Sequence, residues 1–299
     1  MLFALVNGVV VGAMYGLFAL GIVLVYRGTK VINFAAPALG SFGMYITWML
    51  QAEQGVTWLA AAIIGILASG LVAILFERFI VRSMHDAPRL SVAVATIGLM
   101  LLLISVELFV WTGSPRALPP PIAGSGWSLF GVVLTPTKML SVAVAIVLGV
   151  ALTQFLRRTD FGLGVQAAAM DPTAVRLVGV RLSEVSTFVW GVGGMLAVVA
   201  ALLVMPSIGG FAPGTVTAIF FVPSVAAALL GGLDDLSGAF VGGIVIGLVT
   251  SIAEWVRIEF SWQFPAVQLV AVFAVIVVVL LQAPDGVMTR LRVGLGGAR

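Results

Sequence analysis

The sequence predicts an all-α polytopic membrane protein, a bundle of about nine (eight to ten) transmembrane helices. Of its 299 residues, 61% are hydrophobic and only 9% are charged, whereas about a quarter of the residues of a soluble domain are charged. A soluble fold of this length has too little interior to hide that much apolar surface, so lipid must surround most of the chain. The apolar runs are long and unbroken, which favours helices over the alternating strands of a membrane barrel.

Nine apolar runs, separated by charged and turn-forming residues, define the expected helices. Most are long enough to cross a hydrocarbon core of about 30 Å at a rise of about 1.5 Å per residue. They cover residues 2–26, 33–50, 57–76, 91–111, 139–156, 184–205, 215–232, 237–255 and 264–282. The second and seventh runs are short and contain Pro37 and Pro223, so we expect either helix to be broken or partly re-entrant there.

The basic residues predict an external N-terminus and a cytoplasmic C-terminus. In that orientation only Arg116, Lys138 and Arg257 of the 15 Lys and Arg residues would lie outside, as the positive-inside rule requires. Indole rings prefer the headgroup level, and five tryptophans fall at predicted outer helix ends, namely Trp48, Trp58, Trp111, Trp255 and Trp262. We therefore expect a multi-pass protein of the cytoplasmic (inner) membrane of a bacterium.

Two segments outside the membrane stand out in a chain that we expect to form one transmembrane domain, residues 1–299. The outer loop, residues 112–138, contains Pro115 and three consecutive prolines at 119–121, which favour extended backbone. The inner loop, residues 157–183, is the longest polar stretch. The remaining loops are too short to fold independently.

The inner loop contains signals for a short helix. Asp171 followed by Pro172 is typical of a helix start, and Gly179 can take the left-handed conformation that ends a helix. These residues predict a helix over 172–178, preceded by an alanine-rich turn over 166–170. Seven residues are marginal alone in water, so this helix needs a surface to pack on. On the residues alone, an ordinary basic cytoplasmic loop explains these features better than a docking site does.

Polar side chains within the expected spans are candidates for lining a pathway: Asn7, Asn33, Ser41, Thr96, Ser105, Glu107 and Ser224. A carboxylate at position 107 would be costly against lipid, so it should face protein or water, in a structural pair or in a pathway. Glu77 and Glu254 lie at helix ends, where we expect them to be solvated. Glycines four residues apart favour close helix packing in lipid, which is our interpretation of Gly8, Gly12, Gly16, Gly238 and Gly242.

Enzymatic motifs are missing from the sequence. It contains no Gly-x4-Gly-Lys-Ser/Thr phosphate loop, so the chain is not an ATPase by that motif. It has no cysteine, and no cluster has the spacing of a metal site or a catalytic triad. We therefore expect no catalytic residue, no metal and no cofactor on this chain, and no nucleic-acid partner.

Four stretches resemble the branched-chain amino acid permease family, the LivH/LivM-type integral subunits of ATP-binding-cassette (ABC) importers, and the LivH type most closely. They are LVNGVVVGAMYGLFALGIVLVY from Leu5, INFAAPALGSFGMY from Ile32, the inner loop with Ala169, Asp171, Ala174 and Gly179-Val180, and LLGGLDDLSGAFVGGIVIG from Leu229. The likeness covers nearly the whole chain. Two departures are Ala36-Pro37-Ala38, where the family often has polar residues, and Asp234-Asp235, where it usually has Gly-Ser. We expect the second departure to alter contacts with the ATPase or with lipid.

The resemblance implies an ABC-importer permease for branched-chain or related amino acids, which is not itself an enzyme. Its implied partners are a second, LivM-like permease or a copy of itself, two LivG/LivF-like ATPase subunits that carry the ATP, an extracytoplasmic solute-binding protein, and membrane lipid. The residues implied to engage the ATPase are Gln166, Ala169, Asp171, Pro172, Ala174, Arg176, Leu177, Gly179 and Arg181. The alternatives are an ABC permease for a sugar, urea or an amide, and a secondary transporter or channel.

Overall fold

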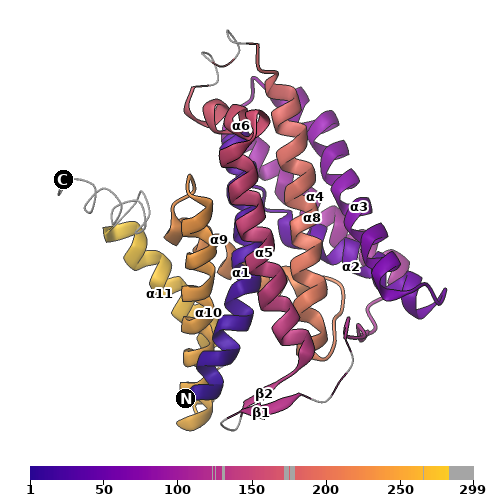
Figure 1. Cartoon of the computed structure of the whole chain (residues 1–299), viewed down its shortest axis with the longest axis vertical. Helices are drawn as coiled ribbons and strands as arrows, with labels where there is room; N and C mark the ends of the chain where they lie inside the picture. Colours follow the sequence, from indigo (N-terminus) through magenta and orange to yellow (C-terminus); the bar gives the residue numbers. More distant parts are fainter. Residues whose placement is uncertain are drawn as a thin grey trace.

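The structure is a computed structural model that describes residues 1–122, 124, 126–129, 132–171, 175, 179–264 and 266–282. Its long helices run side by side along the vertical axis of Figure 1. The N-terminus and a small β-hairpin lie at one end of the bundle, and helix α6 lies at the other (Figure 1). The first end corresponds to the expected outer side of the membrane and the second to the cytoplasmic side.

The nine expected runs correspond to nine α-helices of the described chain. These are α1 (Leu2–Thr29), α2 (Ala36–Ala52), α3 (Trp58–Phe76), α4 (Arg89–Trp111), α5 (Pro136–Arg158), α8 (Leu182–Ile208), α9 (Thr215–Gly231), α10 (Leu236–Glu259) and α11 (Val267–Gln282). Six are long and apolar enough to cross a membrane, counting α3 with its continuation to Met84, whereas α9 and α11 are shorter apolar helices. Helix α2 has 17 residues. The prediction of an all-α polytopic membrane bundle is confirmed.

Pro37 and Pro223, the prolines of the second and seventh apolar runs, lie at different positions in their helices. Pro37 lies in the first turn of α2, where its missing N–H costs nothing. The chain before it is not helical and is buried: Asn33 Oδ1 accepts the Ala35 N–H at 3.0 Å, and the Phe34 N–H donates to Thr96 Oγ1 at 3.1 Å. Pro223 lies inside α9, which continues through it. The chain between α1 and α2 is therefore a short non-helical segment that turns at residues 34–35, and the side chains of Asn33 and Thr96 accept two of its backbone N–H groups.

Helices α1 and α8 form the centre of the bundle and are buried along most of their length. Helix α1 packs on α10 through glycines: a Cβ added to Gly12 would lie 2.7 Å from the Ile244 Cα, and one on Gly247 would lie 2.3 Å from the Gly12 Cα. Gly8 and Gly16 touch α10 in the same way. A Cβ on Gly242 would lie 2.4 Å from the Ala227 carbonyl oxygen of α9. Backbones approach this closely only where side chains are absent.

The outer loop contains structure that the sequence analysis did not predict. Strand β1 (Trp127–Leu129) pairs antiparallel with β2 (Val132–Leu134), and the β-branched and aromatic residues of this stretch favour strands. Earlier in the loop, Arg116 and Phe211 exchange two backbone hydrogen bonds of 2.8 Å each. That bridge fastens the loop to the connection between α8 and α9.

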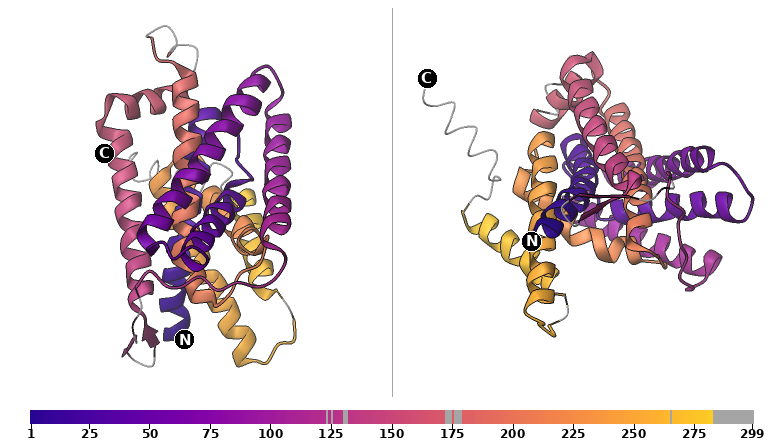
Figure 2. Two further views of the ribbon diagram at one scale, coloured as in Figure 1. Left: turned by 90° about the vertical axis from the view of Figure 1, so that its right-hand side faces the viewer. Right: turned by 60° about the horizontal axis from the view of Figure 1, so that its bottom comes forward.

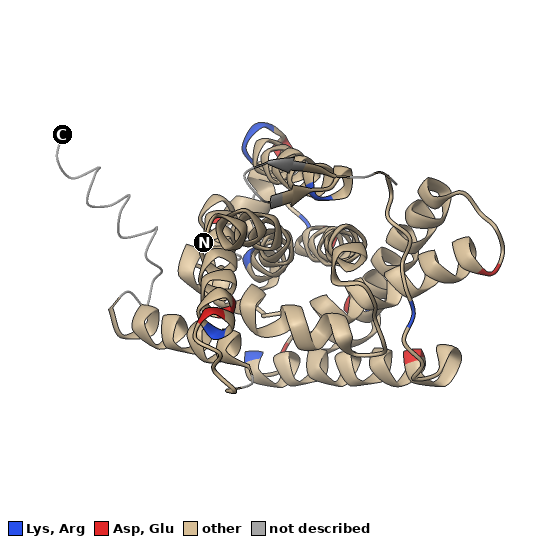
Figure 3. Ribbon diagram, turned by 90° about the horizontal axis from the view of Figure 1, so that it is seen from below, with Lys and Arg blue, Asp and Glu red and all other residues tan. Residues whose placement is uncertain are grey.

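Charged residues are sparse over the whole bundle. Viewed from the outer end, few of the residues along the ribbon are Lys, Arg, Asp or Glu (Figure 3). At the inner end, α6 (Asp160–Met170) turns across the tip of the bundle after α5 (Figure 2). Function must therefore depend on a small number of polar groups, at the ends of helices or buried between them.

Candidate functional site

The inner loop begins with helix α6, which corrects the predicted turn over 166–170. Thr159 caps the helix, because its hydroxyl oxygen accepts the Gly162 N–H at 3.0 Å. A Cβ on Gly162 would lie 2.5 Å from the Leu156 Cα, so the sharp corner between α5 and α6 requires glycine. Gln166 donates a hydrogen bond from its side-chain amide to the Leu156 carbonyl. With a cap at its start and four good helix formers near its end, the segment is helical rather than a turn.

Beyond α6 only part of the expected docking helix is described. Pro172, Ala174, Arg176 and Leu177 lie outside the described residues, so a helix over 172–178 stays a prediction. Val175 is buried, and its N–H donates to the Asp171 carbonyl at 3.2 Å. Gly179 has a φ of +85°, a conformation that favours glycine. Ala169 is half-buried, Asp171 is exposed, and Arg181 pairs with Glu184 at 2.5 Å.

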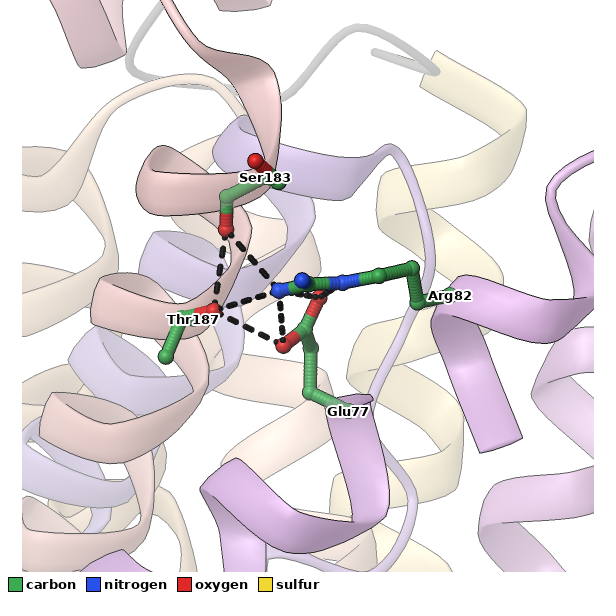
Figure 4. Close-up of polar contacts among 4 residues, drawn as sticks. All are labelled: Glu77, Arg82, Ser183 and Thr187. Carbon is green, nitrogen blue, oxygen red and sulfur yellow. Dashed lines mark hydrogen bonds and ion pairs between the residues drawn. The ribbon is translucent and has the colours of Figure 1, made fainter. Parts of the chain in front are cut away.

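A polar cluster joins the inner ends of α3 and α8 (Figure 4). We call Glu77, Arg82, Ser183 and Thr187 the inner cluster. Arg82 Nη2 lies 3.1 Å from Glu77 Oε2 and 2.8 Å from Thr187 Oγ1, and the Thr187 hydroxyl donates to Glu77 Oε2 at 2.9 Å. Arg82 Nη2 also lies 3.3 Å from the Ser183 carbonyl oxygen. The Glu77 side chain is only 1% exposed, which corrects the expectation that it is solvated.

The inner cluster depends on an unusual turn in the backbone. Residues Glu77–Val81 form a π-helical turn, in which the Arg82 N–H donates to the Glu77 carbonyl. The wider turn has hydrogen bonds between residues five apart, so it places Arg82 over Glu77. Because Ser183 and Thr187 belong to the first turns of α8, the cluster fastens α3 to the helix that follows the inner loop.

The acidic pair at 234–235 makes contacts within the chain. Lys30 Nζ lies 2.9 Å from Asp234 Oδ1, which ties the end of α1 to the turn between α9 and α10. Asp235 caps α10, because its Oδ1 accepts the Ser237 N–H at 3.1 Å. The departure from the family signature thus has an internal structural role.

The candidate pathway residues differ in burial. Asn33, Ser41, Thr96, Glu107 and Ser224 are buried, and Asn7 is half-buried. Ser105 is exposed, and its hydroxyl donates to the carbonyl of Leu101 in its own helix at 2.8 Å. The structure brings Asn33 and Thr96 together around residues 33–35, and Ser41 beside Glu107. It leaves Asn7 and Ser224 apart from both groups.

A second polar cluster lies in the outer half of the bundle. We call Ser41 and Tyr45 of α2 and Glu107 and Trp111 of α4 the outer cluster; each pair is four residues apart and so shares one helix face. The Tyr45 and Trp111 rings stack with their centroids 5.0 Å apart. Glu107 is fully buried, and its Oε2 accepts the Gly214 N–H at 3.4 Å, just before α9 begins.

Four polar atoms of the outer cluster have no hydrogen-bond partner among the described residues. They are Ser41 Oγ, Tyr45 Oη, Glu107 Oε1 and Trp111 Nε1. Sequence reasoning missed Tyr45, and it placed Trp111 at the lipid interface, although Trp111 is buried. The spacing of Ser41 with Tyr45 and of Glu107 with Trp111 was the signal that would have found them. Buried polar groups without partners are rare and mark a place where a polar ligand or a proton can be held.

Comparison with known proteins gives one consistent family. The family described as branched-chain amino acid transport system / permease component matches residues 4–280. A high-affinity branched-chain amino acid transport system permease protein, BraD of Pseudomonas aeruginosa, is 28% identical over 298 residues, which cover 96% of this chain and 95% of that protein. A probable branched-chain amino acid transport permease protein, LivH of Methanocaldococcus jannaschii, is 29% identical over 91% of this chain and 87% of its own.

Among solved structures, PsaBC from Streptococcus pneumoniae in complex with Fab resembles the fold. The TM-score is 0.52 at 16% sequence identity, and the match covers 97% of this chain and 94% of that one. At this identity the likeness concerns the arrangement of helices alone.

Proposed function

The chain belongs to the branched-chain amino acid transport permease family, and from this membership we propose that it is the membrane-embedded permease subunit of an ABC importer for branched-chain or related amino acids. The observation that carries the proposal is a family match over residues 4–280, nearly the whole chain, together with branched-chain amino acid transport permease relatives that are covered over 95% and 87% of their length. The match favours amino acids over the sugar, urea and amide alternatives, and an ABC permease over a secondary transporter.

The proposed importer contains three further kinds of subunit. A second permease subunit, LivM-like or a further copy of this chain, completes the translocation pathway. Two LivG/LivF-like ATPase subunits bind at the inner end and hold the ATP, and an extracytoplasmic solute-binding protein delivers substrate at the outer end. We place the complex in the cytoplasmic membrane of the cell.

The inner end offers a route for mechanical coupling. The ATPase subunits would bind the inner loop, where the Gln166 side-chain amide of α6 donates a hydrogen bond to a carbonyl of α5. The loop leads directly into α8, and the inner cluster ties α8 to α3 through Arg82 and Thr187. A displacement of the loop therefore moves α5, α8 and α3 together, which supports alternating access by tilting of packed helices.

Polar groups lie at two levels along the interface between α2 and α4. Thr96 accepts the Phe34 N–H beside Asn33, and Glu107 with Ser41 lies about eleven residues, or roughly 16 Å, farther out along α4. A zwitterion that crosses an apolar bundle needs polar partners one after another along its path, because an uncompensated charge in hydrocarbon has a high free energy. We therefore assign Asn33, Ser41, Thr96 and Glu107 to the pathway, while Asn7 and Ser224 stay candidates on the sequence alone.

Reconstitution of the full importer tests the proposal. Proteoliposomes with the second permease, the ATPases and the binding protein should take up leucine when ATP is supplied to the ATPase side, and isoleucine and valine should compete. Dissipating ion gradients with ionophores should leave uptake unchanged. Uptake that follows an ion gradient without ATP, or competition by sugars alone, would contradict the assignment.

A further inference from the structure

A cleft of about 560 Å³ opens between α3 and α8 at the inner end of the bundle. Its deep wall is apolar and includes Ile74, Gly191, Val192 and Met195, and its mouth includes Arg78, Arg82 and Glu184. Above this cleft the helices touch closely, since a Cβ on Gly194 would lie 2.9 Å from the Ala73 Cβ. The cleft is thus closed at its deep end and is polar only at its mouth.

The cleft has the length of one lipid leaflet. Its lining on α8 runs from Ser183 to Met195, which corresponds to about 18 Å of helix. One leaflet contributes about 15 Å of hydrocarbon. On α3 the residues beside the cleft are lipid-facing, with Leu71 55% and Leu75 42% exposed. An acyl chain can therefore lie along the apolar wall with its head at the mouth.

The charge at the mouth fits an anion. Arg78 is exposed, and no hydrogen bond or ion pair joins it to another residue in the described part of the chain. The carboxylates nearby are already matched, because Glu77 pairs with Arg82 and Glu184 with Arg181. Helix α8 begins at Leu182 with no side-chain cap, so the positive end of its dipole also faces the mouth.

We propose that the cleft between α3 and α8 is a binding site for an anionic phospholipid of the inner leaflet, with the phosphate at Arg78 and one acyl chain along Ile74, Gly191 and Met195. Basic pockets between transmembrane helices on the cytoplasmic side suit such headgroups. Free phosphate shares the headgroup chemistry but has nothing to fill the apolar wall. The lipid would lie in the groove along the seam of two helices that the inner cluster fastens, and the proposal does not depend on which substrate is transported.

Quantifying lipid that stays bound to the purified importer tests the site. The complex is extracted in mild detergent, and retained phosphatidylglycerol and phosphatidylcholine are measured by native mass spectrometry. Arg78→Gln should lower retained phosphatidylglycerol about fivefold, the equivalent of about 1 kcal/mol for one basic residue, and Arg78→Lys should restore most of it. Val192→Phe, which fills the wall without changing charge, should lower retention of both lipids.

Arg158→Gln is the matched control, since Arg158 is an exposed arginine at the same end of the bundle. It should retain lipid like the unaltered protein. Equal retention by Arg78→Gln and Arg158→Gln would overturn the proposal, as would displacement of the lipid by inorganic phosphate alone. Loss of lipid in Val192→Phe with thermal unfolding unchanged would separate the site from a general folding defect.

Discussion

Two buried glutamates at opposite halves of the bundle differ in what surrounds them. Glu77, 1% exposed, is held by Arg82 and by the Thr187 hydroxyl. Glu107 is 0% exposed, lies beside Ser41, accepts a single backbone N–H at 3.4 Å, and has one oxygen without a partner among the described residues. A matched charge holds helices in place, whereas an unmatched one costs stability and is kept for a functional reason. The inner ends of α3 and α8 are therefore held together and move as a unit, and the outer half is the part that rearranges.

Removing Arg82 should have the largest effect on stability. Arg82→Ala leaves the Glu77 carboxylate buried with only Thr187 to bind it; because Arg82 itself is 40% exposed, the loss should be about 1–3 kcal/mol, less than for a fully buried pair. Thermal unfolding in detergent should therefore shift strongly downward.

The double variant Arg82→Ala with Glu77→Ala sharpens this test, because it removes the stranded charge as well. It should be more stable than Arg82→Ala alone. Equal stability of the single and double variants would mean that Glu77 does not need its partner, and the contrast with Glu107 would be lost.

Replacing Glu107 should have the opposite pattern, with little loss of stability and a loss of transport. Glu107→Gln keeps the size of the side chain and removes a charge that has no cationic partner at hydrogen-bond distance, so unfolding should shift by less than about 1 kcal/mol or towards greater stability. ATP-driven leucine uptake should fall about tenfold, equivalent to about 1.4 kcal/mol. Glu53→Gln, at an exposed glutamate after α2, should leave uptake unchanged; normal uptake by Glu107→Gln would remove Glu107 from the pathway.

The exposed ion pair between Lys30 and Asp234 should contribute much less than the buried pair at the same end. Asp234 is 71% exposed, and exposed pairs contribute about 0–1 kcal/mol and weaken in salt. Asp234→Asn should therefore lower the unfolding free energy by less than about 1 kcal/mol at low salt and by almost nothing at high salt. A larger loss that persists in high salt would show that the turn between α9 and α10 is as firmly fixed as α3 and α8.

Removing the Tyr45 hydroxyl should have the smallest effect on stability. Tyr45→Phe removes a buried oxygen without a partner and keeps the ring stacked on Trp111, so stability should change by less than about 0.5 kcal/mol. A clear destabilisation in thermal unfolding would indicate that the hydroxyl is bound in the native state, and the outer cluster would then be less open to a ligand than its geometry suggests.

Much of the fold is predictable from the sequence, because apolar runs bounded by charged residues correspond directly to α1–α5 and α8–α11. The non-helical chain at 33–35 was only partly predicted, since Pro37 marks a helix start as readily as a break. Helix α6 was missed because an alanine run between charged residues was interpreted as a turn. Its cap, Thr159, was the overlooked signal.

The polar clusters were harder to predict, because each joins helices far apart in the sequence. Glu77 was expected to be solvated at a helix end, yet a π-helical turn brings Arg82 over it and α8 supplies Thr187. The spacing of four residues that is typical of an α-helix does not predict that Glu77 pairs with Arg82, five residues later. Glu107 is predicted to face protein or water, but its neighbours Tyr45 and Trp111 depend on how α2 and α4 face each other.

The absence of cysteine from the sequence allows a direct measurement of the central claim, that the inner end moves as a unit while the outer half rearranges. Spin labels on Ser83→Cys and Glu184→Cys report the separation of α3 and α8 at the inner end, and labels on Gln54→Cys and Thr112→Cys report the outer ends of α2 and α4. In the assembled importer, trapping the ATPases with a non-hydrolysable ATP analogue should shift the outer distance and leave the inner one unchanged. A shift of the inner distance with a constant outer distance would contradict the account.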